Sequence, residues 1–218
     1  MSLFAFGCSL TYGQALLDCT GQDVYTPGPN PSDHAWPSEL ANIVNIPCVN
    51  LSLPGISNKY ILKQILNAPI TKNDTVVVQW SYFSRWTVFK DDGNHLHIGP
   101  WKNDSFKIFL DNYYSEDDCV FNNVLVIDHA WLHLEKIGCD FVFACAEKNN
   151  EKYWNDEDKI KHLFNEKHFK HSNKFHLSIK DFMTDKGLDN RHPGPDSHKS
   201  YAKYLSDLPI FSQLTNTK

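Results

Sequence analysis

TVVVQW, residues 75–80, is the stretch from which the fold class can be argued. Three valines follow one another in it, so apolar residues do not alternate with polar ones as they do in a half-exposed strand. A continuous β-branched run of this kind is typical of a strand covered on both faces, in the middle of a parallel sheet. We therefore predict a central strand here, with helices on both sides of it.

The rest of the chain alternates between strand-like and helix-like segments. Short apolar runs predict further strands over residues 2–6, 48–53, 140–146 and 174–179. Apolar residues at helical spacing predict helices over residues 36–45, 56–67, 122–137, 155–170 and 197–205. This alternation predicts an α/β fold, a three-layer α/β/α sandwich with a mainly parallel central sheet.

The length of 218 residues suits one domain with a substantial core. No internal repeat or low-complexity linker divides the chain, so we expect residues 1–218 to form a single domain. The segment at about residues 82–118 interrupts the alternation, because it is polar with scattered aromatic residues. We predict that it is a long insertion running over the edge of the sheet.

Charge and composition exclude several classes of partner. The net charge is −5 and no block of basic residues occurs, which argues against a nucleic-acid partner. No apolar run approaches the ~18–20 residues of a membrane span, and MSLFAFGCSL at residues 1–10 lacks the features of a signal peptide. We expect a cytoplasmic protein without a membrane partner. The six cysteines include no CxxC pair, and we expect no disulfide, metal or cofactor.

The loops at the carboxyl ends of the strands are where such a sheet binds its ligands. In FGCSLTYG, residues 6–13, Ser9 ends the first strand, where its hydroxyl can attack a carbonyl and its N–H can hold the oxyanion. DNRHPGPDSH, residues 189–198, supplies a candidate base. Asp189 can hold Nδ1–H of His192 and leave Nε2 free to take the serine proton. Each motif alone is more typical of an ordinary turn, whereas together they fit one arrangement.

Three neighbours of these residues are expected to be structural. Cys8 should pack inward, because alternating side chains let only one of Cys8 and Ser9 face His192; a nucleophilic Cys8 is the alternative. Asp196 is a candidate N-cap of the last helix. His198 is expected to make a hydrogen bond at the start of that helix rather than to act as a base.

Four stretches of the chain resemble the SGNH hydrolases, also called GDSL-type hydrolases. FGCSLTYG is similar to their first block, GDSxTxG, with Cys8 in the place of the usual Asp. VNLSLPGISN (49–58) resembles the second block, and DNRHPGPDSHKSYA (189–202) resembles the last one. HAWPSELANI (34–43) is similar to the segment between the first two blocks in phage and bacterial members, so a phage-encoded protein is one alternative.

This resemblance covers nearly the whole chain and implies the flavodoxin-like SGNH hydrolase fold. It also implies a catalytic triad of Ser9, His192 and Asp189. Gly55 takes the position of the glycine that gives its N–H to the oxyanion hole in that family.

One block departs from the family pattern. The third block usually ends in GxND, whose Asn is the third oxyanion donor, but this chain has VVVQWSYFSRW at 76–86. Ser81, Ser84 or Gln79 could replace that donor, and Arg85 could bring positive charge to the site. Losing one such donor costs roughly 10²–10³-fold in rate, so the departure bears directly on activity.

Two functions follow from these observations. The first is a carboxylic ester hydrolase acting on an acyl ester, with an acetyl ester of a small molecule or a carbohydrate as its substrate. Aromatic residues of the insertion would suit sugar rings, and the alternative is that they simply cover the edge of the sheet: Tyr82, Trp86, Trp101, Tyr113 and Tyr114. The alternative is a catalytically degenerate binding or structural module of the same fold, for example in a phage particle. A nucleotide-binding protein is disfavoured, because the chain has neither a P-loop motif nor GxGxxG.

Overall fold

The computed structural model describes residues 1–218 apart from 100–106, 109–110, 113, 147–174 and 212–218. Its main feature is a five-stranded sheet whose strands all run parallel, in the order β2-β1-β3-β6-β7. The strands are β1 (Leu3–Gly7), β2 (Cys48–Asn50), β3 (Thr75–Trp80), β6 (Asp140–Cys145) and β7 (Phe175–His176). Counted within this sheet alone, the order is the 2-1-3-4-5 order of flavodoxin-like folds, as the sequence predicts.

β3 is the central strand, and all six of its residues are buried. It pairs with β1 from Leu3↔Thr75 to Gly7↔Gln79, and with β6 on its other side. Because both faces of the strand are covered, neither is exposed to solvent. This explains why its valines do not alternate with polar residues. The prediction made from TVVVQW is confirmed.

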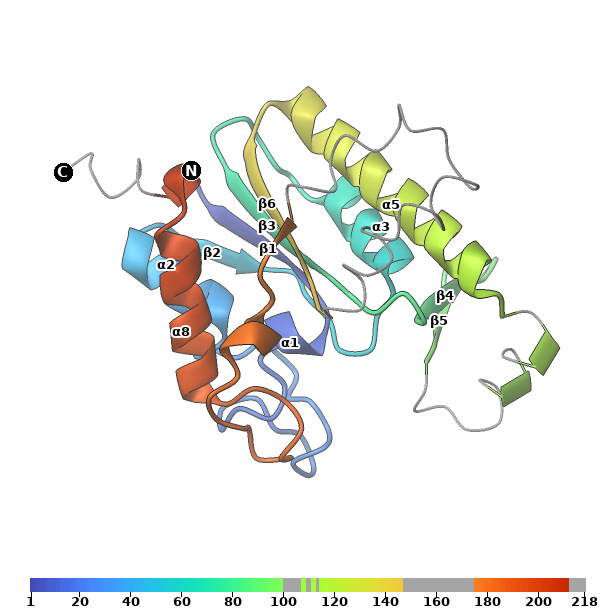
Figure 1. The fold of residues 1–218 in the computed structure, drawn as a ribbon, viewed down its shortest axis with the longest axis horizontal. Coiled ribbons are helices and arrows are strands. Elements are labelled where there is room, and N and C mark those ends of the chain that lie inside the picture. Colours follow the sequence, from blue (N-terminus) through green and yellow to red (C-terminus); the bar gives the residue numbers. More distant parts are fainter. Residues whose placement is uncertain (100–106, 109–110, 113, 147–174, 212–218) are drawn as a thin grey trace.

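Two pairs of helices cover the two faces of the sheet (Figure 1). α2 (Trp36–Val44) and α8 (Pro195–Ser206) pack together on one face. α3 (Asn58–Asn67) and α5 (Glu116–Ile137) pack together on the other. The predicted three-layer α/β/α sandwich with a parallel central sheet is therefore confirmed.

Large aromatic side chains fill the spaces between the layers. Trp36 of α2 and Tyr201 of α8 are fully buried and meet edge to face, with ring centroids 5.4 Å apart. On the α5 side, Phe143 meets Trp80 at 5.2 Å and Trp131 at 5.6 Å. Burying a side chain of this size contributes about 1.5–3 kcal/mol. This packing holds the strand ends, and the loops that follow them, in fixed positions.

Several elements differ from the sequence prediction at their ends. β2 stops at Asn50 instead of continuing to residue 53. α5 begins at Glu116, well before the predicted start, because Ser115 serves as its N-cap and accepts from the N–H of Asp118 at 3.4 Å. The predicted helix over 155–170 lies outside the described residues.

A two-stranded hairpin occupies the start of the predicted insertion. β4 (Trp86–Phe89) and β5 (His95–Ile98) pair antiparallel, and the N–H of Lys90 donates to the carbonyl of Asn94 at 2.9 Å. Gly93 in the turn has a φ of 80°, a conformation that favours glycine. The sequence analysis missed this hairpin, although DDGN between two apolar stretches is a known signal for one. Much of the remaining segment is not described, so the insertion stays a prediction.

Within the described part of the chain, no helix combines the length and the apolar composition needed to cross a bilayer. All six cysteines are free. Of the residues that the structure describes, no three His, Cys, Asp or Glu side chains are grouped as metal ligands would be.

Candidate active site

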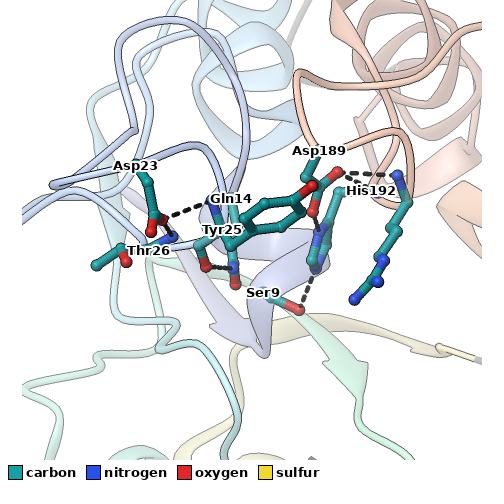
Figure 2. Close-up of polar contacts among 8 residues, drawn as sticks. Ser9, Gln14, Asp23, Tyr25, Thr26, Asp189 and His192 are labelled. Atoms are coloured by element: carbon teal, nitrogen blue, oxygen red, sulfur yellow. Dashed lines mark hydrogen bonds and ion pairs between the residues drawn. The ribbon is translucent and has the colours of Figure 1, made fainter.

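The turn that follows β1 carries Ser9. After Gly7 the chain enters the short helix α1 (Ser9–Tyr12), whose first residue is Ser9 and whose N-cap is Cys8. Cys8 is fully buried, as the sequence analysis predicts, whereas the hydroxyl of Ser9 faces His192 (Figure 2). The nucleophile candidate therefore lies at the carboxyl edge of the sheet, where such folds bind ligands.

Three side chains form one hydrogen-bonded chain in Figure 2. Ser9 Oγ lies 3.0 Å from His192 Nε2, and Nδ1 of the same ring lies 2.6 Å from Asp189 Oδ2. Ser9 and His192 are 183 residues apart in the sequence, so only the fold brings them together. The geometry thus places these three predicted residues in the order that a Ser-His-Asp triad requires.

Asp189 is held in its ionised form. Burial raises its pKa, but the N–H and the ring of His192, together with the N–H of Arg191, lower the pKa more strongly. The two N–H groups lie 3.0 and 2.9 Å from Oδ1. An ionised carboxylate can only accept, so the neutral imidazole carries its proton on Nδ1. Nε2 is left to accept the hydrogen bond from the hydroxyl of Ser9.

The loop that carries the imidazole is fastened to the serine turn. The N–H of Gly187 donates to the carbonyl of His192 at 2.8 Å, which closes the loop on itself. The N–H of Leu188 donates to the carbonyl of Ala15 at 2.9 Å, and Ala15 has a left-handed φ of 68°. Because Ala15 lies shortly after Ser9, this bond fixes the two halves of the site relative to each other.

Asp185 accepts hydrogen bonds from N–H groups at the start of α8. This corrects the prediction that Asp196 is the N-cap of that helix. The N-cap is Gly194 and not Asp196, because Pro195 occupies the first helical position and places Asp196 inside the first turn. Asp185 accepts from the N–H of Ser197 at 2.8 Å and from that of Asp196 at 3.1 Å. Burial raises the pKa of Asp185, but the hydroxyl and N–H of Ser197 and the N–H of Asp196 lower it more strongly. A Cβ on Gly194 would collide with this carboxylate.

His198 is fully buried beneath the same helix start. Its Nδ1 accepts from the N–H of Trp36, the first residue of α2, at 3.0 Å. The expected hydrogen bond is therefore made, although it serves the start of α2 and not that of α8. Burial lowers the pKa of His198 to about 3, so the ring is neutral at neutral pH. Its Nε2 has no hydrogen-bond partner among the described residues.

Residues from the neighbouring strands support the serine turn. Asn50, at the end of β2, donates from Nδ2 to the carbonyl of Thr11 at 3.0 Å. A Cβ on Gly7 would collide with the Thr11 side chain and would lie 3.0 Å from the Gln79 carbonyl oxygen. Gly7 therefore permits a close approach that no other residue would allow. The sequence analysis did not single out Asn50, whose only signal is its place at the carboxyl end of a strand.

Gly55 lies in the turn after β2. The chain runs beside β1 as far as this turn, because the N–H of Leu51 donates to the Ala5 carbonyl (2.9 Å) and that of Leu53 to the Gly7 carbonyl (3.2 Å). Gly55 has a φ of 77°, and its N–H donates to no acceptor in the part of the chain that the structure describes. This position is compatible with the predicted role in an oxyanion hole, which stays a prediction.

Ser81 and Arg85 lie in the loop after β3 and contact each other. Nη1 of Arg85 donates to Ser81 Oγ at 2.9 Å, and the guanidinium lies over the Tyr82 ring at 4.5 Å. Ser81 is fully buried, and its N–H donates to Oδ1 of Asn58 at 2.6 Å. These contacts hold the loop against α3. The assignment of Ser81 and Arg85 to the oxyanion hole or to substrate binding stays a prediction, and Asn58 is a supporting residue that the sequence analysis missed.

No protein-family model and no curated protein matches the sequence, but solved structures share its fold. A carbohydrate esterase, whose active site displays divergent catalytic and non-catalytic binding functions, gives a TM-score of 0.56 at 12% identity, over 100% of this chain and 69% of its own. The acetyl xylan esterase Est2A of the rumen bacterium Butyrivibrio proteoclasticus gives 0.56 at 15% identity, over 94% of this chain and 62% of its own. The psychrotrophic esterase EstA of Pseudoalteromonas sp. gives 0.53 at 11% identity, over 99% of both chains.

These structural neighbours are described as esterases, and a further one, from Desulfitobacterium hafniense, as a lipolytic protein of the G-D-S-L family, with sequence identities of 11–15%. Similarity at this level establishes the fold. The SGNH hydrolase fold that the sequence motifs imply is therefore confirmed, and the activity has to be argued from the site itself.

Proposed function

We propose that this chain is a carboxylic ester hydrolase that cleaves acyl esters, acetyl esters of carbohydrates above all, with Ser9 as its nucleophile. The observation that carries the proposal is the chain of contacts from Ser9 Oγ to His192 at 3.0 Å and from His192 to Asp189 at 2.6 Å. A serine hydroxyl needs such a base, and the base needs a third group to orient it. Carbohydrate esterases and an acetyl xylan esterase among the structural neighbours support the choice of substrate.

In the first step, Ser9 Oγ attacks the ester carbonyl carbon while His192 Nε2 takes its proton. Asp189 stabilises the imidazolium that forms and stays ionised throughout. The carbonyl oxygen gains the negative charge, and the N–H groups of Ser9 and Gly55 are the donors proposed for it. The tetrahedral intermediate then releases the alcohol, which takes the proton from Nε2, and leaves an acyl group on Ser9.

In the second step, a water molecule attacks the acyl carbon. His192 Nε2 takes a proton from that water and then returns it to Ser9 Oγ as the acyl–oxygen bond breaks. The carboxylic acid leaves, and the serine hydroxyl is restored. The proton transfers of both steps use Ser9, His192 and Asp189, which lie within hydrogen-bonding distance of one another.

Hydrolysis of 4-nitrophenyl acetate by the wild type and by Ser9→Ala tests the proposal. We expect the substitution to remove the activity above the uncatalysed rate, and a fluorophosphonate to label Ser9 as located by mass spectrometry. Ser200→Ala is the matched control, since Ser200 is exposed on α8. Equal rates for wild type and Ser9→Ala would exclude Ser9 as the nucleophile.

A second candidate function is a binding module that has kept the site but lost turnover. The missing third-block Asn favours it, and one structural neighbour is described as having both catalytic and non-catalytic binding functions at its active site. The same assay separates the two functions. A protein that binds an acetylated sugar but shows no Ser9-dependent hydrolysis would be the binding module.

A further inference from the structure

Tyr25 and Arg191 lie beside the triad but take no part in the chemistry proposed for it. The Tyr25 side chain is 60% exposed. In Figure 2 its ring lies between Gln14 and the pair formed by Asp189 and His192. The guanidinium of Arg191 lies 5.7 Å from the centroid of that ring. An aromatic ring and a cation thus lie close to each other beside Asp189 and His192.

The backbone that carries Tyr25 is firmly held. Asp23 Oδ1 accepts from the N–H of Tyr25 at 2.9 Å and from that of Thr26 at 2.7 Å (Figure 2). Gln14 Nε2 donates to the carbonyl of Tyr25 at 3.0 Å, and the N–H of Gln14 donates to the carbonyl of Ser9 at 3.1 Å. The backbone of Tyr25 is therefore held relative to the nucleophile by a short series of hydrogen bonds. A Tyr side chain has only two rotatable bonds, so it offers contact area at a low cost in conformational entropy.

Arg191 is positioned by the loop that positions the imidazole. Its N–H donates to Asp189 Oδ1, and it directly precedes His192 in the chain. The side chain is exposed, and no carboxylate pairs with its guanidinium among the described residues. A guanidinium without a carboxylate partner is planar, and two of its N–H groups can donate parallel hydrogen bonds to the two oxygens of one carboxylate.

We propose that Tyr25 and Arg191 bind the alcohol part of the substrate and select acetylated sugars that carry a carboxylate, such as uronic acid residues. The ring of Tyr25 stacks on a face of the pyranose, and Arg191 holds the carboxylate. An acetyl group needs little room, so the part of the substrate that extends to Tyr25 and Arg191 is the alcohol. This inference rests on the proposed esterase function and names the substrate class of the same site.

Two acetylated substrates that differ only in the carboxylate test the inference. The pair is an acetylated methyl glucuronoside and the corresponding acetylated methyl glucoside. For the wild type, kcat/KM should be higher for the glucuronoside. In Arg191→Gln the ratio of the two values should fall by about tenfold to a hundredfold, mainly through KM, as expected for the loss of a charge-assisted hydrogen bond.

Four further variants separate the contributions of the charge of Arg191, the planar shape of its guanidinium and the ring of Tyr25. Lys186→Gln removes an exposed cation from the same loop and should leave the ratio unchanged. Arg191→Lys should give an intermediate ratio, because an ammonium keeps the charge but lacks the planar fork. Tyr25→Ala should raise KM for both sugars, and Tyr25→Phe should restore it.

The failure of this inference can be told apart from the failure of the proposed function. If 4-nitrophenyl acetate is hydrolysed in a Ser9-dependent manner while Arg191→Gln keeps the wild-type ratio, the substrate assignment is overturned and the esterase stands. If no Ser9-dependent hydrolysis occurs, calorimetric titration with methyl glucuronoside and methyl glucoside tests the same residues as a binding site. Equal affinities for the two sugars, or no effect of Arg191→Gln, would then overturn the assignment.

Discussion

The buried imidazole of His198 should make the stability of this protein fall as the pH is lowered from 7.5 to 5. The folded state holds the ring in its neutral form, since burial lowers its pKa to about 3. In the unfolded chain a histidine has a pKa of about 6.5. Below that value the unfolded chain takes up a proton that the folded protein cannot, so lowering the pH favours unfolding.

The size of the effect follows from the two values. For a single group with a pKa of about 6.5 unfolded and about 3 folded, the free energy of unfolding falls by about 2 kcal/mol between pH 7.5 and pH 5. Carboxylates of ordinary pKa contribute little above pH 5. Burial also lowers the pKa of His176, which adds to the slope in the same direction.

Urea unfolding followed by tryptophan fluorescence at several pH values measures this slope. His198→Asn removes the titration, while its amide oxygen can still accept from the N–H of Trp36. The wild type should therefore lose about 2 kcal/mol more than this variant between pH 7.5 and 5, and the contribution of His176 cancels in the comparison. His34→Asn is the matched control, because that ring is largely exposed.

Equal pH slopes in the wild type and in His198→Asn would refute the reasoning. If the variant does not fold, NMR of the wild type provides the same test. The ring signals of His198 should stay constant down to pH 5, and a titration of this ring above pH 5 would contradict the argument.

Asp189→Asn should lower kcat by about 10⁴-fold, because the wrong imidazole tautomer then faces the serine, while circular dichroism shows an intact fold; a wild-type kcat in this variant would contradict the role of Asp189. Gly7→Ala should destabilise the protein by about 1–3 kcal/mol in urea unfolding, as overpacking does, since its Cβ would collide with the Thr11 side chain; an unchanged midpoint would show that the turn can move. Asp185→Ala should cost about 1–3 kcal/mol at pH 7, because it leaves N–H groups at the start of α8 unsatisfied. The pKa of Asp185 is lowered in the folded protein, so this stabilisation is present above about pH 4, its unfolded value, and is lost as the pH falls through the folded value. The wild type and the variant should then converge toward pH 2–3, and a difference that stays constant would contradict the assignment.

The layers of the fold could be predicted from the sequence because burial leaves a local pattern. The valine run of β3 and the helical spacing from Trp36 onward reflect which faces of these elements are buried. The residues that form each pattern are close together in the sequence, so the pattern can be recognised without the structure. The cap of α8 could not be predicted in this way. Its acceptor is the carboxylate of Asp185, which a loop brings to the helix, and no pattern within the helix itself indicates that contact.

The candidate site shows the same division. The meeting of Ser9 with His192 was expected from motifs at the two ends of the chain, and neither motif alone would have placed it. The supporting residues, Asn50 and Asn58, lie in the stretch that resembles the second block, but they act through bonds to backbone groups far away in the sequence that the stretch itself does not indicate. The same holds for Tyr25, whose backbone is held by hydrogen bonds to Asp23 and Gln14.

The order in which the parts of the site are translated has a consequence for the growing polypeptide. The ribosome makes the imidazole of His192 183 residues after the hydroxyl of Ser9. Until the later segment has emerged and docked, the serine has no base, and a serine without one is a weak nucleophile. A product that ends before residue 192 would therefore lack the proposed base, and the proposed activity would begin only after the loop that carries His192 has folded against the serine turn.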